Sequence, residues 1–83
     1  MDRRLRLARQ ALEAGDDAAL TLHAHTIKGT AAGMGAERCA HHALRLHDAA
    51  KAGERETAAR VLDILAAEFQ ALLSLIASPS GES

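Results

Sequence analysis

The chain has 83 residues, a formal net charge of −1 at neutral pH and a hydrophobic fraction of 48%. This length limits it to one domain, and the near-neutral charge argues against nucleic acid as its partner, because nucleic-acid-binding proteins usually carry a basic excess. No apolar run approaches the roughly 20 residues that a membrane-spanning helix needs, so we expect no membrane insertion. Cys39 is the only cysteine, which excludes an internal disulfide and fits a reducing, cytoplasmic setting.

The composition predicts an all-α protein. The apolar residues are almost all Ala and Leu, and Phe69 is the only aromatic residue. Ala, Leu, Arg and Glu are strong helix formers, whereas the β-branched and aromatic residues that favour strands are scarce.

The first helix is predicted over about residues 2–14. Leu5, Ala8 and Leu12 share one face at helical spacing. Gly15 is a plausible stop, because glycine readily takes the left-handed conformation that ends many helices.

The second helix is predicted over about residues 17–32, with Asp16 or Asp17 capping its first N–H groups. Its apolar residues repeat at alternating steps of four and three. This spacing predicts a buried seam of Leu20, Ala24, Ile27, Ala31 and Met34.

The third helix is predicted over about residues 36–52 and ends at Gly53. Its seam consists of Cys39, Ala43, Leu46 and Ala50, with Ala36, Ala40 and Leu44 beside it. The fourth is predicted over about residues 54–77. Its seam consists of Leu62, Leu65, Phe69, Leu72 and Ile76, widened by Ala58, Val61, Leu73 and Leu75.

Connections of two to four residues force consecutive helices to run antiparallel. We therefore predict an all-α, antiparallel up-down four-helix bundle as a single domain over residues 1–77. A flexible C-terminal tail is predicted over residues 78–83, which are rich in Ser, Pro and Gly.

Five histidines are unusual in so short a chain: His23, His25, His41, His42 and His47. Two metal ligands on one helix need a spacing of three or four residues, and no pair of these histidines has it. A cross-helix pair of His25 and His47 remains open, but we expect no metal site. We interpret His23, His41 and His42 as exposed or half-buried surface residues.

His25 stands out because of its neighbours. If the seam of the second helix is buried, His25 emerges from the flank of the bundle, with Lys28 on the same side and Gly29 over the next turn. Neutral imidazole is a good nucleophile, and a nearby ammonium group disfavours the protonated ring. Glycine in mid-helix costs about 1 kcal/mol relative to alanine, and access to His25 would be a reason for it. The alternatives are an ordinary surface histidine beside a lysine, and a glycine that lets another helix pack closely.

The stretch around His25 resembles a known family. Ala24-His25-Thr26-Ile27-Lys28-Gly29-Thr30-Ala31-Ala32-Gly33-Met34-Gly35-Ala36 is similar to the signature of histidine-containing phosphotransfer (HPt) domains, Ala-His-x-Leu-Lys-Gly-Ser-Ala-x-x-Leu-Gly-Ala. The stretches 14–20 and 46–53 also resemble the family, so the likeness covers most of the chain.

The resemblance implies a histidine phosphotransfer module of a two-component phosphorelay. His25 would accept a phosphoryl group on its outer ring nitrogen from a response regulator receiver domain, or from a sensor or hybrid histidine kinase, and donate it to a receiver aspartate. Lys28 would stabilise the phosphoryl group and Gly29 would give clearance. The resemblance implies no cofactor on this chain, because Mg²⁺ and most catalytic groups belong to the receiver. The module would then be a phosphocarrier rather than a self-sufficient enzyme.

Beyond mild swaps such as Ile27 and Met34 for Leu, one departure from the family pattern matters. Many relatives have a Gln or Glu on the third helix that hydrogen-bonds the inner nitrogen of the phospho-acceptor ring, and the matching residue here is His47. Only a neutral histidine can accept that bond, so the ring orientation would depend on pH. Further partner-binding candidates are Thr21, Leu22, Ala32 and Lys51, and Leu22 is either an exposed apolar anchor or packed against the first helix.

Two other readings remain open. One is a helical-bundle interaction or scaffold domain without phosphate chemistry. The other is the HPt domain of a larger hybrid or chemotaxis-type histidine kinase, which shares the chemistry and differs in context.

Overall fold

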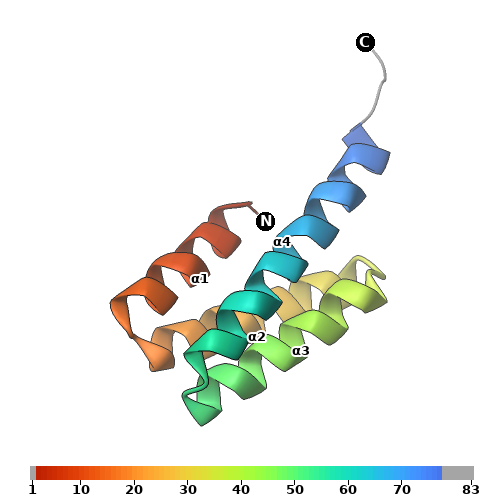
Figure 1. Ribbon diagram of the computed structural model, residues 1–83. Helices are drawn as coiled ribbons and strands as arrows, with labels where there is room; N and C mark the ends of the chain where they lie inside the picture. Colours follow the sequence, from red (N-terminus) through yellow and green to blue (C-terminus); the bar gives the residue numbers. More distant parts are fainter. Residues whose placement is uncertain (1, 78–83) are drawn as a thin grey trace.

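The computed structural model describes residues 2–77, and these form four α-helices without a strand. They are α1 (Asp2–Ala14), α2 (Asp17–Gly33), α3 (Glu37–Ala52) and α4 (Arg55–Ala77). Each helix runs opposite to the one before it (Figure 1). α1 and α3 each contact both α2 and α4, which closes the bundle. The prediction of an all-α, antiparallel four-helix bundle is confirmed, with helix ends within one residue of those expected. The tail predicted at 78–83 lies outside the described residues.

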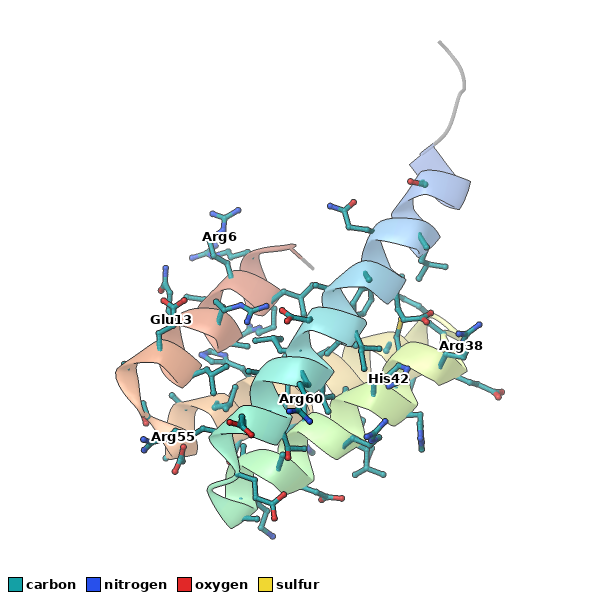
Figure 2. The ribbon with its side chains drawn as sticks, in the orientation of Figure 1. Arg6, Glu13, Arg38, His42, Arg55 and Arg60 are labelled. Atoms are coloured by element: carbon teal, nitrogen blue, oxygen red, sulfur yellow. The ribbon has the colours of Figure 1, made fainter. Side chains whose placement is uncertain are left out.

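The turn between α1 and α2 follows from two residues. Gly15 adopts a left-handed conformation with φ of 72°. The Asp16 carboxylate then accepts a hydrogen bond from the Ala19 N–H at 3.1 Å and caps α2. Arg55, at the start of α4, donates a hydrogen bond to the Gly15 carbonyl oxygen at 3.3 Å and lies 3.6 Å from the Asp17 carboxylate. Arg55 therefore links the start of α4 to this turn (Figure 2).

The core is built from small and medium apolar side chains. Its largest fully buried members are Phe69, Leu20, Ile27, Leu46, Leu62, Leu65 and Val61. Between them lie buried alanines, namely Ala8, Ala11, Ala24, Ala31, Ala43, Ala49, Ala50 and Ala58. No polar or charged side chain is buried among the described residues. Leu5 and Leu12 are half-buried and pack against this core.

Two residues of the predicted seams are exposed. Met34 is 48% exposed, and it lies past Gly33, the last residue of α2. Leu44 is 40% exposed. Positions 36, 40 and 44 advance by about 40° at each step of four along a helix with 3.6 residues per turn, so the third of them rotates off the core face. The side chains of Leu73, Leu75 and Ile76 lie outside the described residues.

The helices differ in length. α4 has 23 residues and α1 has 13, so α4 continues past the start of α1 (Figure 1). Over the described part of the chain, no helix combines the length and the apolar content that a bilayer crossing requires.

Candidate functional site

His25 lies on the outer surface of α2. The helix turns Leu20, Ala24, Ile27 and Ala31 into the core with no exposed area, and this orientation leaves His25 exposed. The side chain is therefore open to water and to an approaching protein, as the apolar periodicity of α2 predicts.

His47 of α3 is the nearest aromatic neighbour of His25. The centroids of the two rings are 6.3 Å apart, and their planes are inclined by 52°. The two rings are not hydrogen bonded to each other. The Nδ1 atom of His47 is buried without a hydrogen-bond partner, and its 3.5 Å separation from Asp48 Oδ1 gives an ion pair only when His47 is protonated. The structure thus brings together the two histidines that the sequence left as a cross-helix pair.

Lys28 and Gly29 are both exposed next to His25 on α2. A Cβ atom built on Gly29 would meet no atom of another part of the chain within 4 Å. Gly29 therefore does not serve close packing of another described helix, which removes that alternative. Gly33, one turn further along, is equally open.

The further partner-binding candidates divide into two kinds. Leu22, Ala32 and Lys51 are exposed, and Leu22 is 61% exposed, so it does not pack against α1. Thr21 is half-buried, and its hydroxyl donates to the Asp17 carbonyl oxygen at 2.7 Å. Thr21 is thus engaged within its own helix.

The remaining histidines have neighbours other than His25. His23 accepts a hydrogen bond on Nδ1 from the Arg4 guanidinium at 3.0 Å, which identifies Nδ1 as the unprotonated nitrogen because arginine only donates. His41 is exposed, His42 is half-buried, and their ring centroids are 5.8 Å apart. Within residues 2–77, no three His, Cys, Asp or Glu side chains come together as a metal site.

Cys39 belongs to the core. It is 3% exposed, and burial raises the pKa of its thiol above the ordinary value of 9.0. The negative charge of Glu68 acts in the same direction, and the Arg38 guanidinium opposes it. Because the thiolate is the reactive form, this thiol is not an activated nucleophile.

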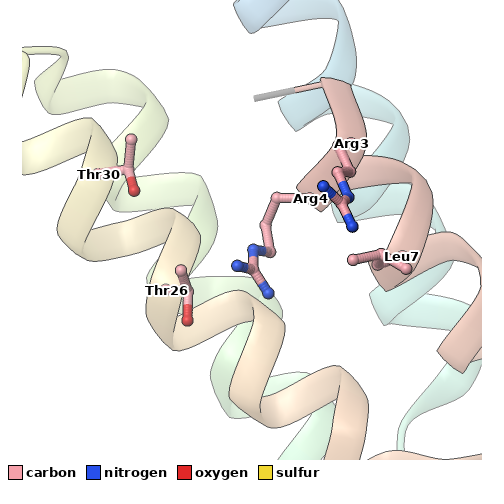
Figure 3. Close-up of a pocket in the computed structure, with 5 residues that line it drawn as sticks. All are labelled: Arg3, Arg4, Leu7, Thr26 and Thr30. Carbon is pink, nitrogen blue, oxygen red and sulfur yellow. The ribbon is translucent and has the colours of Figure 1, made fainter.

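One surface feature near His25 was not predicted from the sequence. A groove between α1 and α2 is lined by Arg3, Arg4, Leu7, Thr26 and Thr30 (Figure 3). Residues 3–9 of α1 contain four arginines and no acidic residue, a clustering that the sequence displays. Which of these arginines face α2 depends on how α1 packs, and the sequence does not reveal that.

Comparison with known proteins agrees with the geometry around His25. The family model described as "Hpt domain" matches residues 1–75. No curated protein and no solved structure gives a significant match to the chain. Hpt domains are helical bundles that take part in histidine phosphotransfer in phosphorelays, with response regulators and kinases as their partners. With a family match over most of its length and a closed helical bundle that exposes His25, this chain belongs to the Hpt domain family.

Proposed function

We propose that this chain is a phosphocarrier in a two-component phosphorelay and that His25 carries the phosphoryl group. The observation that supports this proposal is the exposure of His25 on α2, next to an exposed Lys28 and an unobstructed Gly29. The scaffold reading would leave these three features without a common purpose.

The proposed transfer step starts from the neutral imidazole. The lone pair on Nε2 of His25 attacks the phosphorus of an aspartyl phosphate, and a P–N bond forms as the P–O bond to the aspartate breaks. The aspartate carboxylate leaves with the bonding electron pair, and the proton on Nδ1 of His25 stays in place. The reverse step returns the phosphoryl group to another aspartate.

Lys28 and Gly29 have separate roles in this proposal. The Lys28 ammonium group has no ion-pair partner among the described residues, so its charge is available to the phosphoryl oxygens. Gly29 presents no side chain where the partner's phosphorylated loop must approach. The chain then needs no cofactor of its own, because Mg²⁺ is bound by the partner.

The proposed partners are a response regulator receiver domain and a sensor or hybrid histidine kinase in the cytoplasm. They would dock on the exposed side chains around His25, with Leu22, Ala32 and Lys51 as contacts and Thr21 at the margin. Exposed Leu22 is the apolar residue in this set, and a central apolar contact is typical of protein interfaces.

His47 is proposed to orient the His25 ring. In its neutral form it would accept a hydrogen bond from Nδ1–H of His25, after a rotation of the two rings, whose centroids are 6.3 Å apart, that brings their nitrogen atoms together. Protonated His47 has no acceptor, so acidification would release the ring. We expect His47→Gln to remove this pH dependence, measured by NMR titration of the His25 ring resonances. An unchanged titration would refute the orienting role.

The carrier proposal is tested by phosphate labelling. Incubation with a receiver domain that has been phosphorylated by acetyl phosphate should transfer to the chain a label that is acid-labile and base-stable. His25→Gln should abolish the label, because no other histidine combines this exposure with a neighbouring cation and open glycine. His41→Gln, at an exposed histidine of α3, is the matched control and should keep the label. Unreduced labelling of His25→Gln would show that another residue accepts the phosphoryl group, and a wild-type chain that takes no label would favour the scaffold reading.

A further inference from the structure

The groove between α1 and α2 lies beside His25 and is cationic. It has a volume of about 580 Å³, with Arg3, Arg4 and Leu7 on the α1 wall and Thr26 and Thr30 on the α2 wall. Figure 3 shows Arg4 extending from α1 towards Thr26 across the groove. None of the described residues that line it carries a carboxylate.

Arg3, Arg4 and Thr30 can donate hydrogen bonds into the groove, whereas the Thr26 hydroxyl already donates to the Leu22 carbonyl oxygen at 3.1 Å. Arg3 is exposed and has no hydrogen bond or ion pair with any described side chain, whereas Arg9 of the same helix is paired with Asp63. Arg4 uses part of its guanidinium to donate to His23 Nδ1 and keeps its other N–H groups. The exposed Thr30 hydroxyl has no partner among the described residues. These donors, with no carboxylate among the described lining residues, favour an anionic ligand.

The groove and the His25 surface lie on either side of one exposed edge of α2. Thr26 directly follows His25, and Thr30 directly follows Gly29. Leu22 lies one turn before Thr26 and is 61% exposed. A protein that covers His25 and Leu22 therefore reaches the α2 wall of the groove, and it meets Lys28 on one side and the arginines of α1 on the other.

We propose that this groove binds an acidic segment of the receiver that docks on His25, and that Arg3 and Arg4 pair with its carboxylates. The proposal rests on the proposed phosphocarrier function, because that function brings the partner to this face.

Planar guanidinium groups match carboxylates in bidentate geometry, and Leu7 supplies an apolar contact for the stems of acidic side chains. Complementary charge at an interface rim acts mainly on the rate of association and on the choice of partner. The groove would thus select receivers whose surface next to the phosphorylated aspartate is acidic.

The groove is tested directly with an acidic peptide. The ¹⁵N-labelled full chain is titrated with hexaglutamate, and amide shifts are expected at Arg4, Leu7, Thr26 and Thr30. Arg3→Glu should weaken this binding about tenfold or more, because it reverses a charge that has no hydrogen bond or ion pair with a described residue. Arg60→Glu is the control, because it makes the same charge change on α4, where Arg60 has only a 3.9 Å ion pair with Glu56 (Figure 2). It should bind the peptide as the wild type does.

A second measurement connects the groove to transfer. Discharge of phosphorylated His25 to a receiver with an acidic rim should be about tenfold slower in Arg3→Glu at low ionic strength, and the difference should shrink in high salt. Wild-type affinity of Arg3→Glu for hexaglutamate would overturn the groove proposal. Binding of vesicles with anionic lipids at these residues, without binding of the peptide, would overturn it as well. Failure of the wild-type chain to take label on His25 would instead refute the carrier function, and the peptide titration does not depend on that label.

Discussion

The exposure of His25 follows from its place next to a fully buried residue of α2. Ala24 points into the core, and the next residue of an α-helix is rotated by about 100°. The His25 ring therefore points away from the core. The ring of His47, on α3, lies with its centroid 6.3 Å from that of His25. Burial of the Leu20–Ala31 seam thus determines where the proposed phosphate site lies.

Cys39 supplies a pH-dependent prediction at the residue scale. Burial, followed by the charge of Glu68, raises the pKa of this thiol above 9.0. Above pH 9 the unfolded chain gives up the proton before the folded chain does, so the unfolded state binds fewer protons. The contribution of the protonated Cys39 thiol to the free energy of unfolding is fully present below pH 9. It is lost as the pH rises through the folded-state pKa of this thiol.

We therefore expect the free energy of unfolding to fall between pH 8 and pH 10. Urea denaturation of the wild type and of Cys39→Ala at both pH values measures this effect. The variant should lose less stability over this interval, whatever its stability at pH 8. Equal losses in the two proteins would show that Cys39 does not contribute.

At the scale of the element, the helices begin in different ways. α2 begins with a side-chain cap from Asp16, whereas Ala36 precedes α3 and offers no side-chain hydrogen bond. α1 and α3 are followed by Gly15 and Gly53 in left-handed conformations, with φ of 72° and 73°. The start of α2 therefore depends on one carboxylate, and α2 is the helix that carries His25.

Asp16→Ala is expected to lower the free energy of unfolding by about 1 kcal/mol, because it removes the acceptor for the Ala19 N–H. Urea denaturation at neutral pH measures the loss. Asp16→Asn is the control, since its amide oxygen can accept the same bond and it should stay close to the wild type. A loss in Asp16→Asn as large as that in Asp16→Ala would attribute the effect to charge rather than to the cap.

At the scale of the whole molecule, apolar packing provides most of the cohesion. The ion pairs between described residues of different helices lie at the surface, namely Arg9 with Asp63, Arg38 with Glu68 and Arg55 with Asp17. Exposed ion pairs of this kind contribute about 0–1 kcal/mol each. The buried alanines allow close approach of the helices, and the few large residues fill the centre. The outer faces of α1 and α2 are therefore left for charge and for partner contacts.

The amino-acid sequence by itself determined the helix ends, the inward seams and the outward position of His25. These features depend on local causes: apolar residues at steps of three and four, glycines that accept a positive φ, and a carboxylate placed to cap a helix. The signature around His25 also identifies the family, since its residues lie in one continuous stretch of the sequence.

Only the tertiary structure decided which outer residues meet. Met34 and Leu44 continue an apolar pattern in the sequence but face solvent, because Met34 lies past the last residue of α2 and Leu44 has rotated off the core face of α3. Gly29 could have served helix packing, and the structure leaves it open instead. The α1–α2 groove joins Arg4 to Thr26, residues far apart in the chain, and no local pattern specifies how two helices pack against each other.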